Sequence, residues 1–382
     1  MANRIMLNET SYHGAGAIQE IATEAKAHGF QKAFVCSDPD LIKFGVTKKV
    51  TDVLDKNGLV YEIYSDIKPN PTIQNVQHGV QAFKDSGADY LIAIGGGSSM
   101  DTSKAIGIII ANPEFEDVRS LEGVAPTKKP CVPIIAVPTT AGTAAEVTIN
   151  YVITDVEKKR KFVCVDPHDM PIIAIVDPEM MSSMPKGLTA STGMDALTHA
   201  MEAFLNLFAS RSVQNASIEA VCENFHALPE VWRDGTHLAA RQEMLHASYL
   251  AGFAFTNNFV GYVHAIAHAV GALYHIPHGR ANAVLLPAVL REYGSCIAPK
   301  LAVLADALSL GGDTVSEKAE RMIAAIEAMR DSFDIPSTLP HLSPNDYTEI
   351  ARRALKEANP TYPVPQIWDS EKIFSVLRRV QS

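Results

Sequence analysis

Short runs of β-branched and other apolar residues alternate with amphipathic segments through the first half of the chain. Such runs are typical of buried strands, and segments between them, such as 47–57 and 72–86, have the spacing of amphipathic helices. The predicted strands are residues 33–36, 60–64, 90–94, 133–137, 162–165 and 172–176. This alternation of strand and helix predicts βαβ units and a mainly parallel sheet.

Beyond residue 188 the pattern changes to long segments with helical spacing and almost no strand alternation. The main predicted helices are residues 189–207, 212–228, 238–256, 263–274, 301–308 and 315–333. A chain of 382 residues is also longer than one hydrophobic core usually serves. We therefore predict an α/β domain over residues 1–186 and an all-α domain over residues 187–382.

Composition and charge narrow the range of functions. The net charge is −10, whereas surfaces that bind nucleic acid need clustered Lys and Arg; the one dense basic cluster, residues 158–161, is typical of a solvated turn. No run approaches the ~20 apolar residues of a membrane helix, and the N-terminus lacks the apolar core of a secretory signal. The five cysteines are widely spaced, without a C-x-x-C pair. We expect reduced thiols, a cytoplasmic location, and neither a nucleic-acid nor a membrane partner.

A glycine-rich turn follows the strand predicted at residues 90–94. In Gly95-Gly-Gly-Ser98 the glycines let backbone N–H groups approach a pyrophosphate, and the helix that follows adds partial positive charge at its N-terminus. Ser98 is expected to cap that helix. The turn matches neither G-x-G-x-x-G nor a P-loop, so the residues alone favour a dinucleotide site and a purely structural turn about equally.

Two further segments are candidates for the same dinucleotide site. Pro138-Thr-Thr-Ala-Gly-Thr143 follows the next long strand, at the sheet edge where open α/β folds bind ligands, although a capping turn is the simpler interpretation. Asp38 follows the first predicted strand, where an acid commonly receives the ribose hydroxyls. A carboxylate there would repel a 2′-phosphate and favour NAD over NADP, but an exposed loop aspartate is a common alternative.

Histidines and one aspartate form a candidate metal constellation in the second half. Asp195 and His199 have i, i+4 spacing and share one helix face, although such pairs are more often hydrogen-bonded than metal-bound. His264 and His268 repeat this spacing in an apolar segment, and a turn at Pro277-His278-Gly279 could fold a third imidazole back towards them. Unpaired imidazoles are costly in an apolar setting, so ligation explains the set better than separate core histidines do.

These segments occur in an order that resembles the iron-containing (group III) alcohol dehydrogenases over nearly the full chain. The likeness rests on Gly95–Ser98 with Asp101 and Lys104, on 138–143, on Thr192–Ala200, and on His264 and His268 leading to Pro277–Gly279. It is strongest towards members that act on lactaldehyde and 1,2-propanediol, including residues 1–4 and 118–123. The resemblance implies an α/β Rossmann-like domain plus an all-α domain, as in dehydroquinate synthase, and a homodimer.

The resemblance also implies a role for each matching residue. The implied metal ligands are Asp195, His199, His264 and His278, and His268 is the implied catalytic residue, near the nicotinamide and able to relay a proton. The implied cofactor contacts are Asp38, Asn70, Gly96, Gly97, Ser98, Thr139, Thr140, Thr143, Val152 and Lys161. The implied substrate-pocket residues are Asn150 and Phe255. Together they imply a divalent ion, Fe(II) or alternatively Zn(II), that polarises an alcohol, and hydride transfer to NAD.

The chain departs from the family pattern at two places, and only the second bears on the substrate. Ala288 replaces a histidine that is not a ligand, and residues 358–366 replace a cysteine-containing segment. We expect small primary alcohols or diols and their aldehydes, with glycerol dehydrogenase activity as a nearby alternative. A lyase of the dehydroquinate synthase type would need basic residues that the helix around His264 lacks, although Arg280 follows. A metal-binding protein without catalysis would leave the dinucleotide segments unexplained.

Overall fold

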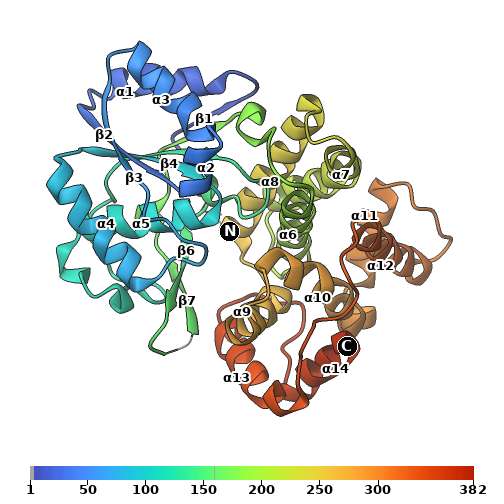
Figure 1. Cartoon of the computed structure of the whole chain (residues 1–382). Helices are drawn as coiled ribbons and strands as arrows, with labels where there is room; N and C mark the ends of the chain where they lie inside the picture. Colours follow the sequence, from blue (N-terminus) through green and yellow to red (C-terminus); the bar gives the residue numbers. More distant parts are fainter. Residues whose placement is uncertain (1–3, 159) are drawn as a thin grey trace. The chain divides into compact units, whose positions relative to one another are not determined.

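The computed structural model describes residues 4–158 and 160–382, so residues 1–3 and Lys159 of the basic cluster lie outside the described part. The chain forms two compact units. One consists of residues 6–184 together with 236–249, and the other is built from residues 4–5, 185–235 and 250–382. The first contains the sheet and the second is helical (Figure 1), which confirms the predicted α/β and all-α architecture.

A six-stranded sheet, parallel throughout, forms the centre of the first unit. Its order is β1-β8-β5-β4-β2-β3, and every pairing is parallel. The strands are β1 (Thr10–His13), β2 (Lys32–Ser37), β3 (Val60–Tyr64), β4 (Tyr90–Gly95), β5 (Ile134–Pro138) and β8 (Ile173–Val176). The predicted parallel sheet is confirmed, with β1 as an additional strand at one edge.

Alternating side chains of the strands build two hydrophobic cores, one on each face of the sheet. In β4, Tyr90, Ile92 and Ile94 belong to one core, whereas Leu91 and Ala93 belong to the other. Helices on both faces complete these cores (Figure 1). The first core includes residues of α1 (Glu20–Ala27) and α3 (Val46–Lys56), and the second includes residues of α4 (Ile73–Ser86) and α5 (Gly97–Ala111).

The strand predicted at residues 162–165 belongs to a separate hairpin instead of the parallel sheet. β6 (Asn150–Asp155) pairs antiparallel with β7 (Arg160–Val165). Buried and partly exposed residues alternate along β6, so one face of the hairpin packs inward. The sequence pattern missed β6 because its apolar run is only three residues long, with Asn150 before it and Thr154 and Asp155 after it.

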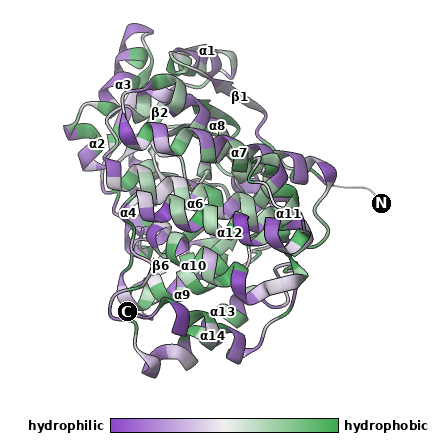
Figure 2. Cartoon of the chain, turned by 90° about the vertical axis from the view of Figure 1, so that its right-hand side faces the viewer, coloured by the Kyte–Doolittle hydropathy of each residue, from purple (hydrophilic) through white to green (hydrophobic). Residues whose placement is uncertain are grey.

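The second unit consists of helices and the loops that join them. They are α6 (Lys186–Leu205), α7 (Arg211–Arg233), α9 (Tyr262–Tyr274), α10 (His278–Tyr293), α11 (Ala298–Ala307), α12 (Val315–Ser332), α13 (Tyr347–Ala358) and α14 (Ser370–Val380), and α8 (Leu238–Asn258) contributes to both units. Figure 2 shows α11 and α12 carrying both hydrophilic and hydrophobic residues, as expected of helices with one buried face. Among the described residues, no helix combines the length and apolarity needed to cross a membrane.

Candidate metal centre and dinucleotide site

Helix α6 presents the first two predicted metal ligands on one buried face. Asp195 and His199 lie one turn apart and are only 2% and 5% exposed. Phe255, from the predicted substrate pocket, stacks on the His199 ring with centroids 4.3 Å apart. The His264 ring also stacks on that of His199, with centroids 4.3 Å apart, so the His199 imidazole is held between two rings.

Helices α9 and α10 bring two more imidazoles to Asp195. The Nε2 atom of His264 on α9 lies 3.7 Å from Asp195 Oδ1, and the Nε2 atom of His278 lies 3.5 Å from the same oxygen. Asp195, His199 and His264 each offer a donor atom within 4.8 Å of the others. Donors about 2.1 Å from a common tetrahedral ion lie roughly 3.4 Å apart, so these separations suit a divalent transition-metal ion.

His278 reaches this position as the first residue of a helix, with Pro277 as its N-cap. The expected turn at Pro277-His278-Gly279 is therefore the start of α10, which the sequence analysis did not predict. Gly279 allows a close approach to α6, since a Cβ at this position would lie 2.2 Å from the Ser191 carbonyl oxygen. The absence of a side chain at Gly279 thus lets α10 lie close enough to α6 for His278 to reach Asp195.

Asn282 is a buried residue at this centre that the sequence analysis missed. Its Nδ2 group donates to Asp195 Oδ1 at 2.6 Å and lies 3.2 Å from the Nε2 atoms of both His264 and His278. Asp195 Oδ1, His264 Nε2 and His278 Nε2 therefore all lie around the Asn282 amide nitrogen, which shows that these three predicted ligand atoms point to a common centre. The signal available in sequence was the i, i+4 spacing of His278 and Asn282 on one helix face.

The electrostatics of the cluster match a cation. Burial by itself would raise the pKa of the Asp195 carboxyl group, but the imidazoles of His199, His278 and His264 hold it well below its usual range. Burial would lower the pKa of His264, but hydrogen bonds to Asp195 and Glu202 raise it to about 9. Without a metal ion, the Asp195 carboxylate favours a proton on the imidazole of His264. A bound divalent ion would replace that proton.

His268, the predicted catalytic residue, lies beside the cluster. Its ring stacks on that of His278 with centroids 5.1 Å apart, while its Nδ1 atom lies 2.8 Å from Glu357 Oε1. Tyr362 donates a hydrogen bond to the same oxygen at 2.9 Å. Glu357 thus orients His268 through Nδ1 and leaves Nε2 for a reacting proton. Tyr362 lies in the segment that departs from the family pattern.

The glycine turn of the first unit joins β4 to α5. Gly95 has φ +148°, and a Cβ there would lie 2.3 Å from Ser99 Oγ, so this position requires glycine. The expected cap by Ser98 is wrong: Gly96 is the N-cap, no side chain caps the helix, and Ser98 lies within its first turn. Without a capping side chain, the first N–H groups of α5 remain for an anion.

The threonine-rich segment after β5 contacts this glycine turn. The Thr139 N–H group donates to the Gly95 carbonyl at 3.0 Å. A Cβ at Gly96 would lie 2.9 Å from Thr140 Oγ1, and one at Gly97 would lie 3.1 Å from Thr143 Cγ2. The structure therefore brings together six of the predicted cofactor residues, Gly96, Gly97, Ser98, Thr139, Thr140 and Thr143, at the carboxyl ends of β4 and β5.

The hairpin carries further predicted contacts. The Val152 N–H group donates to Asp101 Oδ2 at 3.0 Å. Lys161 Nζ donates to Asn70 Oδ1 at 2.6 Å, and burial lowers the pKa of this lysine. Asn150 receives a hydrogen bond on its carbonyl from the buried Lys104, 3.1 Å away.

Asp38 follows β2 and caps a short helix. Its Oδ1 atom accepts the Leu41 N–H group at 2.9 Å, at the start of α2 (Pro39–Lys43). Capping occupies one carboxylate oxygen, so the second remains for a ribose hydroxyl. The residue therefore has a structural task beside the predicted one.

Comparison with known proteins covers nearly the whole chain. Residues 8–178 match the family described as Iron-containing alcohol dehydrogenase, and residues 189–381 match Fe-containing alcohol dehydrogenase family, C-terminal. The chain is 48% identical over 347 residues to lactaldehyde reductase of Escherichia coli (strain K12), covering 90% of this chain and 89% of the relative.

Solved structures extend this similarity to the fold. The crystal structure of 1,3-propanediol oxidoreductase has a TM-score of 0.95 and 35% identity, covering 100% of both chains. Sulfoacetaldehyde reductase from Bifidobacterium kashiwanohense, in complex with NAD+, has a TM-score of 0.88 and 26% identity, covering 100% of this chain and 99% of the other.

Proposed function

This chain belongs to the iron-containing alcohol dehydrogenase family and is an oxidoreductase that uses NAD and a divalent metal, and from this premise we propose that it interconverts small primary alcohols or diols and their aldehydes. The pair 1,2-propanediol and lactaldehyde is the first to test, because of the similarity to lactaldehyde reductase. The observation that carries the proposal is the convergence of Asp195, His264 and His278 on one point.

We assign cofactor binding and metal binding to different halves of the chain. Residues 1–186 bind NAD and residues 187–382 hold the metal and the substrate. The metal ligands are Asp195, His199, His264 and His278, with Fe(II) as the proposed ion and Zn(II) as the alternative, because both accept imidazole and carboxylate ligands. The family resemblance further supports a cytoplasmic location and a homodimer. Sedimentation velocity would test whether the protein is a dimer.

Residues of the chain then position the substrate and accept its proton. When bound, the ion would supply Lewis-acid polarisation of the substrate hydroxyl group, and NAD would accept the hydride. Phe255 contributes an apolar wall beside His199, consistent with a small, weakly polar substrate. His268 Nε2 receives the hydroxyl proton, while Glu357 holds Nδ1.

The test is NADH formation by purified protein reconstituted anaerobically with either Fe(II) or Zn(II). Ethanol, propanol, 1,2-propanediol, ethylene glycol and glycerol would be compared as substrates. We expect turnover with one metal and a graded preference for small alcohols or diols, while a preference for glycerol would select the glycerol dehydrogenase alternative. No turnover of any alcohol, with NAD still bound, would overturn the proposal in favour of a lyase.

His268→Ala should lower kcat about a hundredfold, the usual contribution of one general acid or base. Because the Asp195 contacts to His264 and His278 do not involve His268, we expect the metal content to stay at the wild-type level. Stopped-flow NADH formation and elemental analysis measure the two quantities. An unchanged kcat in a variant with full metal content would remove His268 from the reaction.

Asp38→Asn should raise the ratio of NADP to NAD activity about fivefold, the factor that corresponds to about 1 kcal/mol of like-charge repulsion between well-solvated groups. Asparagine also caps helices, so α2 should persist while the charge disappears. The matched control is Asp40→Asn, two residues along on the exposed side of α2. The measurement is kcat/KM for both cofactors, and an equal ratio in wild type and variant would refute this role of Asp38.

A further inference from the structure

A buried carboxylate that the sequence analysis did not single out lies behind the proposed metal ligands. Glu202 is 5% exposed and follows His199 by three residues on α6. Its Oε2 atom lies 2.6 Å from His264 Nδ1, the ring nitrogen opposite the one that faces Asp195. Its Oε1 atom accepts the Val263 N–H group at 2.7 Å. Both oxygens therefore contact the first turn of α9.

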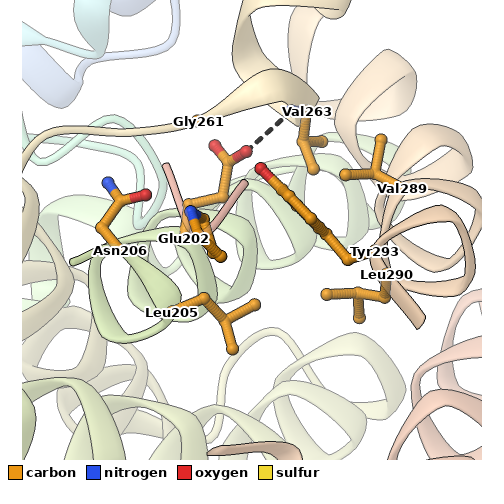
Figure 3. Close-up of a pocket in the computed structure, with 9 residues that line it drawn as sticks. Glu202, Leu205, Asn206, Gly261, Val263, Val289, Leu290 and Tyr293 are labelled. Atoms are coloured by element: carbon orange, nitrogen blue, oxygen red, sulfur yellow. Dashed lines mark hydrogen bonds between the residues drawn. The ribbon is translucent and has the colours of Figure 1, made fainter. Parts of the chain in front are cut away.

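The surrounding backbone is shaped around this carboxylate. Gly261, the N-cap of α9, has no side chain to cap the helix, and a Cβ there would lie 2.8 Å from Glu202 Oε1. Figure 3 shows the Glu202 carboxylate directed towards Gly261 and Val263, with the hydrogen bond to the Val263 N–H group drawn. Glu202 thus caps α9 from a neighbouring helix and fixes the position of the His264 backbone.

The cavity beside the carboxylate is small and lined mainly by apolar side chains, with Asn206 and Tyr293 as the further polar residues of its wall. It measures about 10 Å³, room for roughly one water molecule, and Leu205, Val263 and Leu290 contribute apolar walls. A carboxylate without hydrogen bonds would be costly here. Glu202 is therefore held in the geometry that engages His264.

We propose that Glu202 is a positioning residue for the metal centre, which keeps the proton of neutral His264 on Nδ1 and so leaves the Nε2 lone pair for the ion. The inference rests on the proposed metal centre. A carboxylate accepts from both the Nδ1–H group and the Val263 N–H group, since it has two acceptor oxygens. The wrong tautomer would carry its proton on Nε2, the atom that faces Asp195.

Glu202→Gln separates positioning from packing, because glutamine has nearly the same shape but only one acceptor oxygen. If that oxygen accepts the Val263 N–H group, the NH₂ group faces His264 Nδ1 and favours the wrong tautomer. We expect Zn(II) and Co(II) affinities to fall about 10- to 100-fold, the usual effect of losing a carboxylate behind a metal-bound histidine. The d–d spectrum of bound Co(II) should also change, which a purely structural loss at a distance would not cause.

The experiment titrates metal-free full-length protein with Co(II) and Zn(II) against a competing chelator, with circular dichroism to confirm folding. Glu357→Gln is the matched control, because Glu357 contacts an imidazole of the same helix that is not a proposed ligand; its metal affinity should be unchanged. A folded Glu202→Gln protein with wild-type affinity and Co(II) spectrum would overturn the proposal. Should this variant not fold, Glu202→Asp, which keeps both acceptors but is shorter, must weaken binding; wild-type affinity would overturn the proposal equally.

Failure of the metal centre has a different signature. Wild-type protein that bound neither ion would overturn the metal centre and the role of Glu202 together. Metal binding without turnover of any alcohol would overturn the proposed reaction, while the affinities of the Glu202 variants would still decide the positioning role.

Discussion

His264→Ala should remove the metal and reduce kcat/KM for alcohol oxidation by roughly a thousandfold or more. A bound ion supplies several kcal/mol of transition-state stabilisation, and about 1.4 kcal/mol corresponds to a factor of ten in rate. His264 is buried and lies at the middle of the centre, because its Nε2 atom lies near Asp195 and Asn282 while Nδ1 contacts Glu202. Its removal also leaves the Glu202 carboxylate with one partner fewer in a buried site.

The measurements for this variant are metal content by elemental analysis and NADH formation under saturating metal. His237→Ala is the control, since His237 is exposed and belongs to the other unit. It should retain wild-type metal content and activity. Stoichiometric metal together with near-normal turnover in His264→Ala would show that the reaction does not depend on this centre.

Gly279→Ala should weaken metal binding and destabilise the helical unit, although it adds only one methyl group. The new Cβ would lie 2.2 Å from the Ser191 carbonyl oxygen and 3.4 Å from Asp195 Cβ. The closest atom belongs to the backbone, so a rotamer change cannot relieve the overlap and α10 must move away from α6. That movement separates His278 from Asp195. We expect about 1–3 kcal/mol lower free energy of unfolding and at least tenfold lower metal affinity.

Gly187→Ala provides the matched control on α6. Nothing lies within 4 Å of a Cβ at Gly187, so alanine there should leave metal affinity unchanged and raise the free energy of unfolding by roughly 0.4–1 kcal/mol. Chemical denaturation and chelator competition measure both variants. Equal metal affinity in the Gly279→Ala and Gly187→Ala proteins would contradict the close approach of the two helices.

The local sequence determined the strands and helices whose pattern is strong. β2, β3 and β4 were predicted because short apolar runs with turn residues at both ends exclude a long helix. Asp195, His199, His264 and His278 were recognised because the spacing within the helices and the family motifs both pointed to them. Three of their donor atoms converge on Asn282, but they come from α6, α9 and α10, so only the packing of these helices produces the convergence.

The tertiary structure decided the features that depend on residues distant in sequence. β1 has no apolar alternation and becomes a strand only because β8, about 160 residues later, supplies its hydrogen-bond partners. The N-cap of α5 is Gly96 because β4 ends at Gly95 and the helix begins at Gly97. Serine is a common N-cap residue, so the residue type of Ser98 could not reveal that the helix begins before it. From the sequence alone, Glu202 and Asn282 are only two polar residues within helices. Their roles arise because α6, α9 and α10 pack together, and a buried polar group takes its partner from whichever helix lies opposite.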